Sequence, residues 1–166
     1  MYSKIYWIDN NFSNLPGKIG TMGRPRGEDW LEDEVKNFSI RGVDIMVSLL
    51  EKDEIYELGL QEEGRFCETY GIRFVHFPVP DRDIPEDPFI AKSLVEELVS
   101  AIHLGKKVVV HCRIGVGRSS MIAAGVLKKL GIDEPFERIS QARGLKVPDT
   151  KAQMDWVEEV FGGNGG

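Results

Sequence analysis

The chain has 166 residues, 42% of them hydrophobic and 29% charged, which is typical of one globular domain. A formal net charge of −6 argues against a general nucleic-acid or anionic-membrane binder, because such proteins need a basic surface. Two cysteines cannot form a disulfide framework, the N-terminal MYSKIYWIDN lacks the apolar core of a signal peptide, and the longest apolar run, MIAAGVL, is too short to span a bilayer. We therefore expect a soluble, cytoplasmic protein with no membrane or nucleic-acid partner. Its single domain is expected over residues 1–161, followed by a flexible tail over 162–166.

The first half of the chain alternates short strands and helices. Residues 4–9 and 18–22 flank a turn-rich connection and predict an antiparallel pair of strands. A helix is predicted over 27–42, because apolar residues recur there at helical spacing and acids fill the first turns. Cys67 falls in a short helical segment and is interpreted as a small packed hydrophobe. The other elements predicted in this half are a buried strand over 43–50, two glycine-terminated helices over 54–59 and 62–71, and a strand over 72–79.

The second half predicts one strand and several helices. The helix over 87–105 is the best specified, with Asp87 as N-cap, Pro88 at the first helical position and Gly105 at its end. The other elements are an apolar strand over 106–112 and helices over 119–131, 134–144 and 150–161. Strands that alternate with helices predict a single α/β domain whose central, largely parallel sheet is flanked by helices on both faces.

A glycine-rich loop in VVVHCRIGVGRSS, residues 108–120, follows the last predicted strand and opens a helix. Such a loop binds anions, because its free N–H groups converge on one point and the helix dipole adds positive charge there. Glycines let the backbone approach a ligand closely, and Arg118 can hold two oxygens of a tetrahedral dianion in a bidentate fork. The same field favours the thiolate form of Cys112, so the loop binds phosphate and directs a nucleophile at its phosphorus. The residues expected to surround the phosphate are Arg113, Ile114, Gly115, Val116, Gly117 and Arg118.

HCRIGVGRS fits the signature H-C-x-x-x-x-x-R-[ST], and the chain over 4–161 resembles the compact dual-specificity branch of the cysteine-based protein tyrosine phosphatase superfamily. The resemblance implies that Cys112 attacks phosphorus to form a phosphocysteine, which water then hydrolyses. It also implies that Arg118 and the loop amides stabilise the equatorial oxygens, that Ser119 donates a hydrogen bond to the departing thiolate, and that His111 orients the loop. It implies no cofactor and no metal, and the expected active-site ligands are phosphate, sulfate or vanadate.

A general acid is also needed, because an alkoxide or phenoxide leaves phosphorus poorly without a proton. In the family this acid is an aspartate on a separate loop directly after a strand, and FPVPDRDIPEDP, residues 77–88, occupies that place. Asp81 matches the position of the acid in similar small phosphatases. Asp83 is its rival, and Asp87 is better used as a helix cap.

Three further side chains allow two interpretations each. TKAQ fits a capping box that pairs Gln153 with Thr150, whereas the resemblance places here a glutamine that positions the hydrolytic water. Both interpretations of Gln153 stay open. Arg24 and Arg26, in GRPRG, either line the pocket or tie down a surface loop, and the second interpretation is favoured.

Other kinds of site fit the sequence less well. A cysteine that only packs does not require a preceding histidine, two glycines and an arginine at fixed spacing. A rhodanese-type sulfur-transfer loop also pairs cysteine with arginine, but it usually has a shorter gap and needs no upstream acid loop. Two cysteines and three scattered histidines lack the spacing of metal ligands.

The predicted function is hydrolysis of phosphomonoesters on proteins, with phosphotyrosine as substrate and phosphoserine and phosphothreonine accepted if the site is shallow. No insertion long enough to build a deep phosphotyrosine wall is evident. The loop carries only Arg113 besides Arg118, whereas relatives that take polyphosphorylated inositols tend to carry extra lysines there. The alternatives are a phosphoinositide or nucleotide phosphatase and a catalytically weak phosphopeptide-binding module. Cys112, Arg118 and a candidate acid together favour the enzyme.

Overall fold

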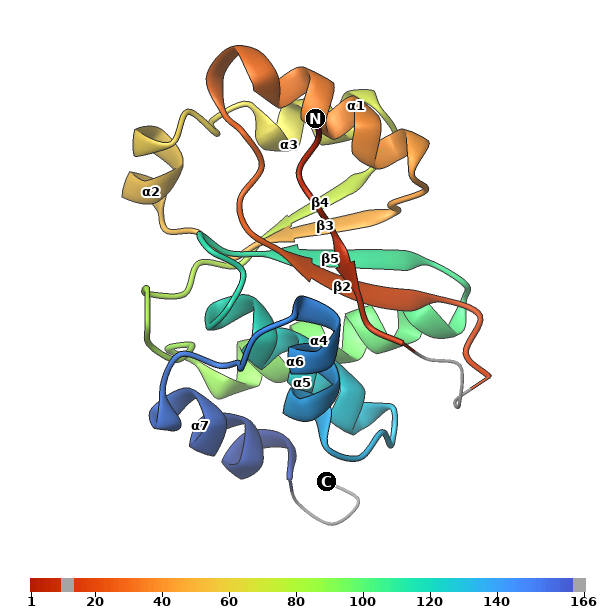
Figure 1. Cartoon of the computed structure of the whole chain (residues 1–166), viewed down its shortest axis with the longest axis vertical. Coiled ribbons are helices and arrows are strands. Elements are labelled where there is room, and N and C mark those ends of the chain that lie inside the picture. The colour runs from red at the N-terminus through yellow and green to blue at the C-terminus, as the bar shows by residue number, and fades with distance from the viewer. Residues whose placement is uncertain (10–13, 163–166) are drawn as a thin grey trace.

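The computed structural model describes residues 1–9 and 14–162, and its centre is a five-stranded sheet (Figure 1). The strands are β1 (Tyr6–Trp7), β2 (Lys18–Met22), β3 (Ile45–Ser48), β4 (Arg73–His76) and β5 (Lys107–His111). Their order in the sheet is β1-β2-β5-β3-β4. β1 pairs antiparallel with β2, and the remaining pairings are parallel. The predicted antiparallel pair and the largely parallel sheet are therefore confirmed.

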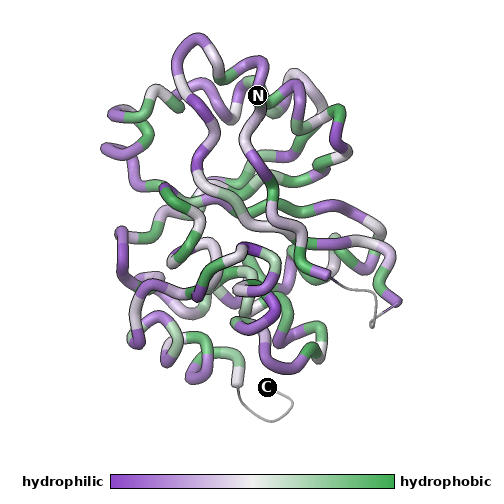
Figure 2. Tube along the Cα trace, in the orientation of Figure 1, coloured by the Kyte–Doolittle hydropathy of each residue, from purple (hydrophilic) through white to green (hydrophobic). Residues whose placement is uncertain are grey.

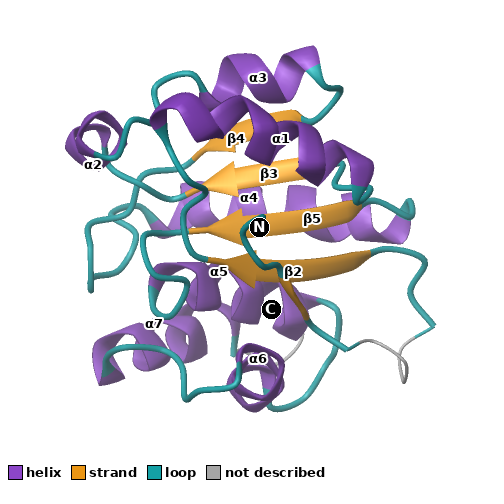
Figure 3. Cartoon of the chain, turned by 45° about the horizontal axis from the view of Figure 1, so that its top comes forward, coloured by secondary structure: helices purple, strands orange, loops and turns teal. Residues whose placement is uncertain are grey.

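Helices cover both faces of the sheet (Figure 3). One face carries α1 (Leu31–Ile40), preceded by a 3-10 turn (Glu28–Trp30), and α3 (Glu63–Thr69). The other face carries α4 (Pro88–His103), α5 (Arg118–Lys129), α6 (Pro135–Arg143) and α7 (Lys151–Phe161), with α6 and α7 packed against α5. The short helix α2 (Lys52–Glu57) lies beyond one end of the strands. In the described part of the chain, no helix has the length and apolar character needed to cross a membrane.

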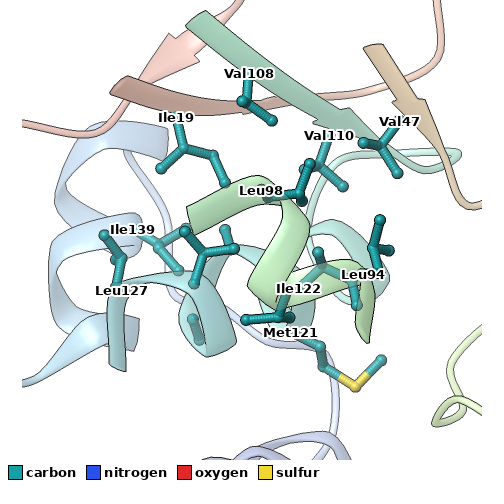
Figure 4. Close-up of a cluster of buried hydrophobic side chains, with 14 of the residues drawn as sticks. Ile19, Val47, Leu94, Leu98, Val108, Val110, Met121, Ile122, Leu127 and Ile139 are labelled. Carbon is teal, nitrogen blue, oxygen red and sulfur yellow. The ribbon is translucent and has the colours of Figure 1, made fainter. Parts of the chain in front are cut away.

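Two hydrophobic clusters lie on opposite sides of the sheet. Successive strand residues point to opposite faces, so β5 contributes Val108 and Val110 to one cluster and Val109 to the other. Figure 4 shows the first cluster, in which these valines meet apolar side chains of α4 and α5, Leu98 and Ile122 among them. Figure 2 shows hydrophilic and hydrophobic residues alternating along the helices, as expected of helices with one buried face.

The predicted elements exist, but several of their ends differ. The predicted strands over 4–9, 43–50 and 72–79 are longer than β1, β3 and β4, because buried apolar residues flank the paired segments at both ends. The helix predicted over 54–59 begins earlier, at Lys52, because Glu51 forms a capping box with Glu54. The helix predicted to begin at residue 119 begins at Arg118. The predicted tail over 162–166 lies outside the described residues, Gly162 excepted, as do residues 10–13 of the connection after residue 9.

The two helix caps that the sequence predicted, at the starts of α4 and α7, are present. The Asp87 carboxylate accepts a hydrogen bond of 2.9 Å from the Phe89 N–H at the start of α4. Thr150 and Gln153 form the predicted capping box at the start of α7. The loops that follow β2, β3, β4 and β5 all leave the sheet at the carboxyl ends of parallel strands, the usual place for a ligand site in such sheets.

Candidate active site

The loop over 112–117 joins β5 to α5, and its backbone requires glycine at one position. Gly115 has a φ of +85°, a conformation that glycine adopts without strain. A Cβ at this position would lie 2.6 Å from the Gly23 backbone nitrogen and 2.6 Å from the Met22 carbonyl carbon. The loop is therefore packed tightly against the end of β2, and Gly115 is what allows this contact.

Arg143, the last residue of α6, holds two carbonyl groups of this loop. Its Nε donates to the Gly115 oxygen at 3.2 Å, and its Nη2 donates to the Ile114 oxygen at 3.3 Å. The guanidinium is itself placed over the Tyr6 ring, 4.4 Å from the ring centroid. In a trans peptide the C=O and the following N–H point in opposite directions. Carbonyls turned outward toward Arg143 therefore turn the N–H groups of Gly115 and Val116 into the loop.

The preceding two peptides of the loop are held in the same way. The Arg24 backbone N–H donates to the Arg113 oxygen at 3.1 Å, and His111 Nδ1 lies 3.4 Å from the Cys112 oxygen. The outward carbonyls again leave the following N–H groups facing inward. The loop is thus a cradle of converging donors at the N-terminus of a 12-residue helix, which is the geometry of an anion site.

The guanidinium of Arg118 is buried and held from several sides. Glu54 accepts two hydrogen bonds, from Nη1 at 2.7 Å and from Nη2 at 2.9 Å. Nη1 also donates to the carbonyl oxygen of Val79 at 3.0 Å and to that of Leu49 at 3.5 Å. Burial alone would lower the pKa of Arg118, but its contacts with Glu54 and the charges of Cys112 and Asp81 raise it above the usual value. Arg118 is therefore a fixed, permanently charged group at the base of the loop.

Glu54, the partner of Arg118, is an ionised carboxylate. Burial raises the pKa of the Glu54 carboxyl, but hydrogen bonds from Arg118 and from the Glu51 backbone, with the charges of Arg118 and Arg113, hold it below its usual value. Arg113 lies on the rim, where its guanidinium is 3.3 Å from Glu57 and 3.9 Å from Glu54. The second arginine of the loop is thus already paired with acids of α2.

Cys112 lies at the base of the loop beside the first turn of α5. Its Sγ lies 3.3 Å from the Ser119 hydroxyl, and both residues are buried. The structure therefore brings together the predicted nucleophile and the hydroxyl expected to serve it. Behind them, His111 Nε2 lies 2.8 Å from the carboxylate of Glu63 on α3.

Asp81 and Asp83 differ in what their carboxylates contact. Asp81 is largely exposed, and its Oδ1 lies 3.3 Å from Arg118 Nη2. The Asp83 carboxylate accepts a hydrogen bond of 2.8 Å from the backbone of the next residue, Ile84. The loop over 77–88 therefore brings Asp81 to the cradle, whereas the Asp83 side chain stabilises its own turn.

Gln153 has features of both interpretations. Its side-chain oxygen accepts from the N–H groups of Asp149 and Thr150, at 3.1 and 3.2 Å, as in a capping box. Its Nε2 donates to the Asp83 carbonyl oxygen at 3.2 Å, and a Cβ on Gly117 would lie 3.0 Å from both side-chain amide atoms. This buried amide therefore caps α7, holds the loop over 77–88 through the Asp83 carbonyl and lies against the cradle.

The two arginines of GRPRG have different surroundings. Arg26 pairs with the buried Glu34 at 3.2 Å, and its guanidinium lies 4.6 Å from the centroid of the Trp30 ring. Arg24 supports the cradle through its backbone, while its side chain donates to the Pro25 carbonyl oxygen at 3.3 Å. Arg26 therefore ties down the loop, which is the interpretation that the sequence favoured.

Glu54, Glu63 and Arg143 are the residues around the site that the sequence analysis did not single out. Glu54 and Glu63 stand on short helices among other acids, and Arg143 stands where a basic residue stabilises a helix end. Within the described residues, no group of three or more histidine, cysteine or acidic side chains is placed to hold a metal ion.

Comparison with known proteins gives a consistent result. Residues 20–131 match the family model Tc-R-P, described as the DSP-PTPase phosphatase of polymorphic toxin systems. A protein of Invertebrate iridescent virus 6, named as tyrosine phosphatase 197R, is 31% identical over 93 residues, or 54% of this chain and 35% of the viral protein. The chain spans between about a third and three-fifths of the curated relatives it matches.

Solved phosphatases share the fold. The crystal structure of kinase associated phosphatase superposes with a TM-score of 0.83 at 20% identity and covers 96% of this chain and 94% of that one. PTPMT1 in complex with PI(5)P superposes with a TM-score of 0.72 at 17% identity, covering 87% and 90% of the two chains. These likenesses confirm the predicted dual-specificity phosphatase-like α/β architecture.

Proposed function

The chain belongs to the DSP-PTPase phosphatase family of polymorphic toxin systems, and on this premise we propose that it hydrolyses phosphomonoesters through a phosphocysteine formed on Cys112. The observation that carries the proposal is the placement of three groups around one loop. Cys112 lies at its base, Arg118 is fixed beside it, and the Asp81 carboxylate is 3.3 Å from the Arg118 guanidinium. We also propose residues 1–161 as the catalytic domain and the cytoplasm as its location.

In the first step, the Cys112 thiolate attacks phosphorus while the bond to the leaving oxygen breaks. The Asp81 carboxyl group donates its proton to that oxygen, so the product alcohol or phenol leaves neutral. Three phosphoryl oxygens accept hydrogen bonds from the inward N–H groups and from Arg118. Because Glu54 takes the edge of the guanidinium formed by Nη1 and Nη2, the phosphate contact is assigned to Nε and to the side of Nη2 that faces Asp81 in this structure.

In the second step, water attacks the phosphocysteine and gives its proton to the Asp81 carboxylate. The S–P bond breaks, inorganic phosphate forms, and the thiolate is restored. Ser119 donates a hydrogen bond to the leaving sulfur, consistent with the 3.3 Å separation of Sγ and Oγ. The Gln153 amide lies beside Gly117, and we assign it to positioning the attacking water in addition to its capping role.

The proposed substrates are phosphorylated proteins, with phosphotyrosine first. The pairing of Arg113 with Glu54 and Glu57 supports this choice over a polyphosphorylated inositol, because it leaves the rim with little net positive charge for a second phosphate. A phosphoinositide is the second candidate, since PTPMT1, which shares the fold, was solved with PI(5)P.

Phosphate release assays with a chelator present test this proposal. Phosphotyrosine, phosphoserine and phosphothreonine peptides, phosphoinositides and nucleotides are compared in parallel for the wild type and for Cys112→Ser. We expect turnover of phosphotyrosine peptides that Cys112→Ser abolishes. Binding of phosphopeptides without turnover would instead identify a binding module, and preference for a lipid or nucleotide would replace the proposed substrate.

A further inference from the structure

A buried carboxylate and imidazole form a pair directly behind the loop that carries Cys112. Glu63 is the first residue of α3, and His111 is the last residue of β5. The Glu63 Oε2 and the His111 Nε2 are 2.8 Å apart, and the two side chains are 2% and 0% exposed. The other ring nitrogen, Nδ1, lies 3.4 Å from the Cys112 carbonyl oxygen. The imidazole therefore links a carboxylate of the helix layer to the peptide of the nucleophile.

Both groups that face the His111 ring are hydrogen-bond acceptors. A carboxylate oxygen and a carbonyl oxygen each accept, so both contacts are hydrogen bonds only if each ring nitrogen carries a hydrogen. An imidazole with both nitrogens protonated is a cation. A buried cation is costly unless an opposite charge lies beside it, and the Glu63 carboxylate is that charge.

The remaining surroundings of the pair do not compete for this role. On α3, burial and the charge of Glu63 raise the pKa of the Cys67 thiol, so Cys67 stays neutral. In the sheet, the residues in register with His111 are Met22 on β2 and Ser48 on β3, and both are uncharged. On the loop side, the titratable neighbour is Cys112, on which Arg118 also acts.

We propose that Glu63 is a positioning residue that keeps His111 doubly protonated, so that the imidazolium holds the Cys112 peptide and stabilises its thiolate from behind the loop. The inference deepens the proposed function and rests on it for the role of Cys112. The Glu63 carboxylate reaches the loop through its hydrogen bond with His111, so we assign its action on Cys112 to that imidazole. The opposite charges that Glu63 and His111 carry, rather than the bulk of their side chains, are what matters.

The protonation of His111 can be observed directly by ¹⁵N NMR of the wild-type protein. The chain has three histidines, and the variants His76→Gln and His103→Gln, both at exposed positions, identify the signals of the other two. At neutral pH we expect both nitrogens of His111 to be protonated in the wild type and one to be unprotonated in Glu63→Gln. An unprotonated His111 nitrogen in the wild type overturns the proposal, even if no Glu63 variant folds.

The effect on the nucleophile is measured by the pH dependence of Cys112 alkylation with iodoacetate. In Glu63→Gln we expect the profile to move to higher pH by about one unit, which is about tenfold slower alkylation on the acidic side. Glu63→Asp should restore much of the wild-type profile. Glu62→Gln is the matched control, because Glu62 pairs with Arg65 on the surface, and its profile should equal that of the wild type.

Coinciding profiles for Glu63→Gln and the wild type overturn the proposal. Neither measurement uses turnover, so the proposed function and the proposed role of Glu63 can fail separately. A doubly protonated His111 in a protein that hydrolyses no phosphomonoester contradicts the proposed function. Normal hydrolysis with a neutral His111 contradicts the role of Glu63 alone.

Discussion

The Arg118 guanidinium and the Glu54 carboxylate meet through two parallel hydrogen bonds, of 2.7 and 2.9 Å, with both side chains largely buried. This fork fixes the plane of the guanidinium independently of any bound anion. Such preorganisation places the orientation of Arg118 under the control of an acid on a different element, α2.

Glu54→Gln should weaken phosphate binding and lower kcat/KM by about 10²-fold, because small misplacement of a binding group has effects of this size. The amide keeps the size of the side chain but presents an N–H group to one guanidinium nitrogen. Inhibition by inorganic phosphate and kcat/KM for p-nitrophenyl phosphate are the measurements. Glu57→Gln is the control, since Glu57 is exposed on the same helix and pairs only with the rim at Arg113. Equal losses in both variants would show a general effect of α2.

The ion pair should also make stability depend on pH in acid. Contacts with Arg118 hold the pKa of Glu54 below its usual value of 4.5, so the pair stabilises the fold fully above that pH. The contribution is lost as the pH falls through the lowered folded-state value. Urea unfolding at several pH values should therefore show a difference between wild type and Glu54→Gln that is constant near neutrality and shrinks in acid. A constant difference across the whole range would mean that the carboxylate charge contributes nothing.

Iodoacetate should label Cys112 much faster than Cys67. Burial and the charge of Glu63 raise the pKa of Cys67, which keeps that thiol protonated, whereas Cys112 faces inward N–H groups and Arg118. Mass spectrometry of partly labelled protein measures both rates. Vanadate or phosphate should protect Cys112 and leave Cys67 unaffected. Similar rates for the two cysteines would contradict the assignment of the nucleophile.

Asp81→Ala should lower turnover of phosphotyrosine by about 10²–10⁴-fold, the usual range for a lost acid or base. The loss should be much smaller for an activated fluorinated phenol, because that leaving group needs little protonation. The alkaline limb of the pH profile should flatten in the same variant. Asp83→Ala is the matched control, since the Asp83 carboxylate caps its own turn. This variant should keep both the turnover rate and the alkaline limb of the pH profile. The opposite pattern in the two variants would assign the acid to Asp83.

Arg143→Ala should raise the inhibition constant for phosphate and lower kcat/KM by about tenfold, because two carbonyls of the loop lose their donors. The oriented N–H groups that follow them would then be free to turn. Arg138→Ala on the same helix is the control, since the Arg138 Nε donates to the Asp133 carbonyl, away from the loop. Unchanged phosphate inhibition in Arg143→Ala would show that the loop holds its shape without this arginine.

The sequence predicted the cradle because its signals are local. The spacing of Cys112 and Arg118 across a glycine loop defines the geometry within a few residues, and Asp81 comes shortly after the predicted strand over 72–79. Glu54 and Glu63 could not be found in this way, since neighbouring acids such as Glu57 have the same local context. Which acid is buried depends on how α2 at the end of the strands and α3 on the face of the sheet are turned, and that is decided by tertiary packing.

The fold was predictable to a similar degree, and the errors in the predicted strand ends have a common cause. Strand ends were placed too late where buried apolar residues, such as Leu50, continue after pairing has stopped. Burial and strand pairing leave the same hydrophobic pattern in a sequence. The structure separates them, because the residues just after β3 line the base of the cradle, where the Leu49 carbonyl receives Arg118.

The contacts of Arg118 also bear on how the protein folds. They reach Leu49, Glu54 and Val79, which are 69, 64 and 39 residues away along the chain. Contacts of such high sequence separation require most loops of the chain to have closed, so the guanidinium is oriented only when folding is nearly complete. We therefore expect phosphate to bind the native state alone and to stabilise it by mass action. A nascent or partly unfolded chain carries the whole motif but lacks the assembled cradle, so we expect a reactive Cys112 thiolate only in molecules that have finished folding.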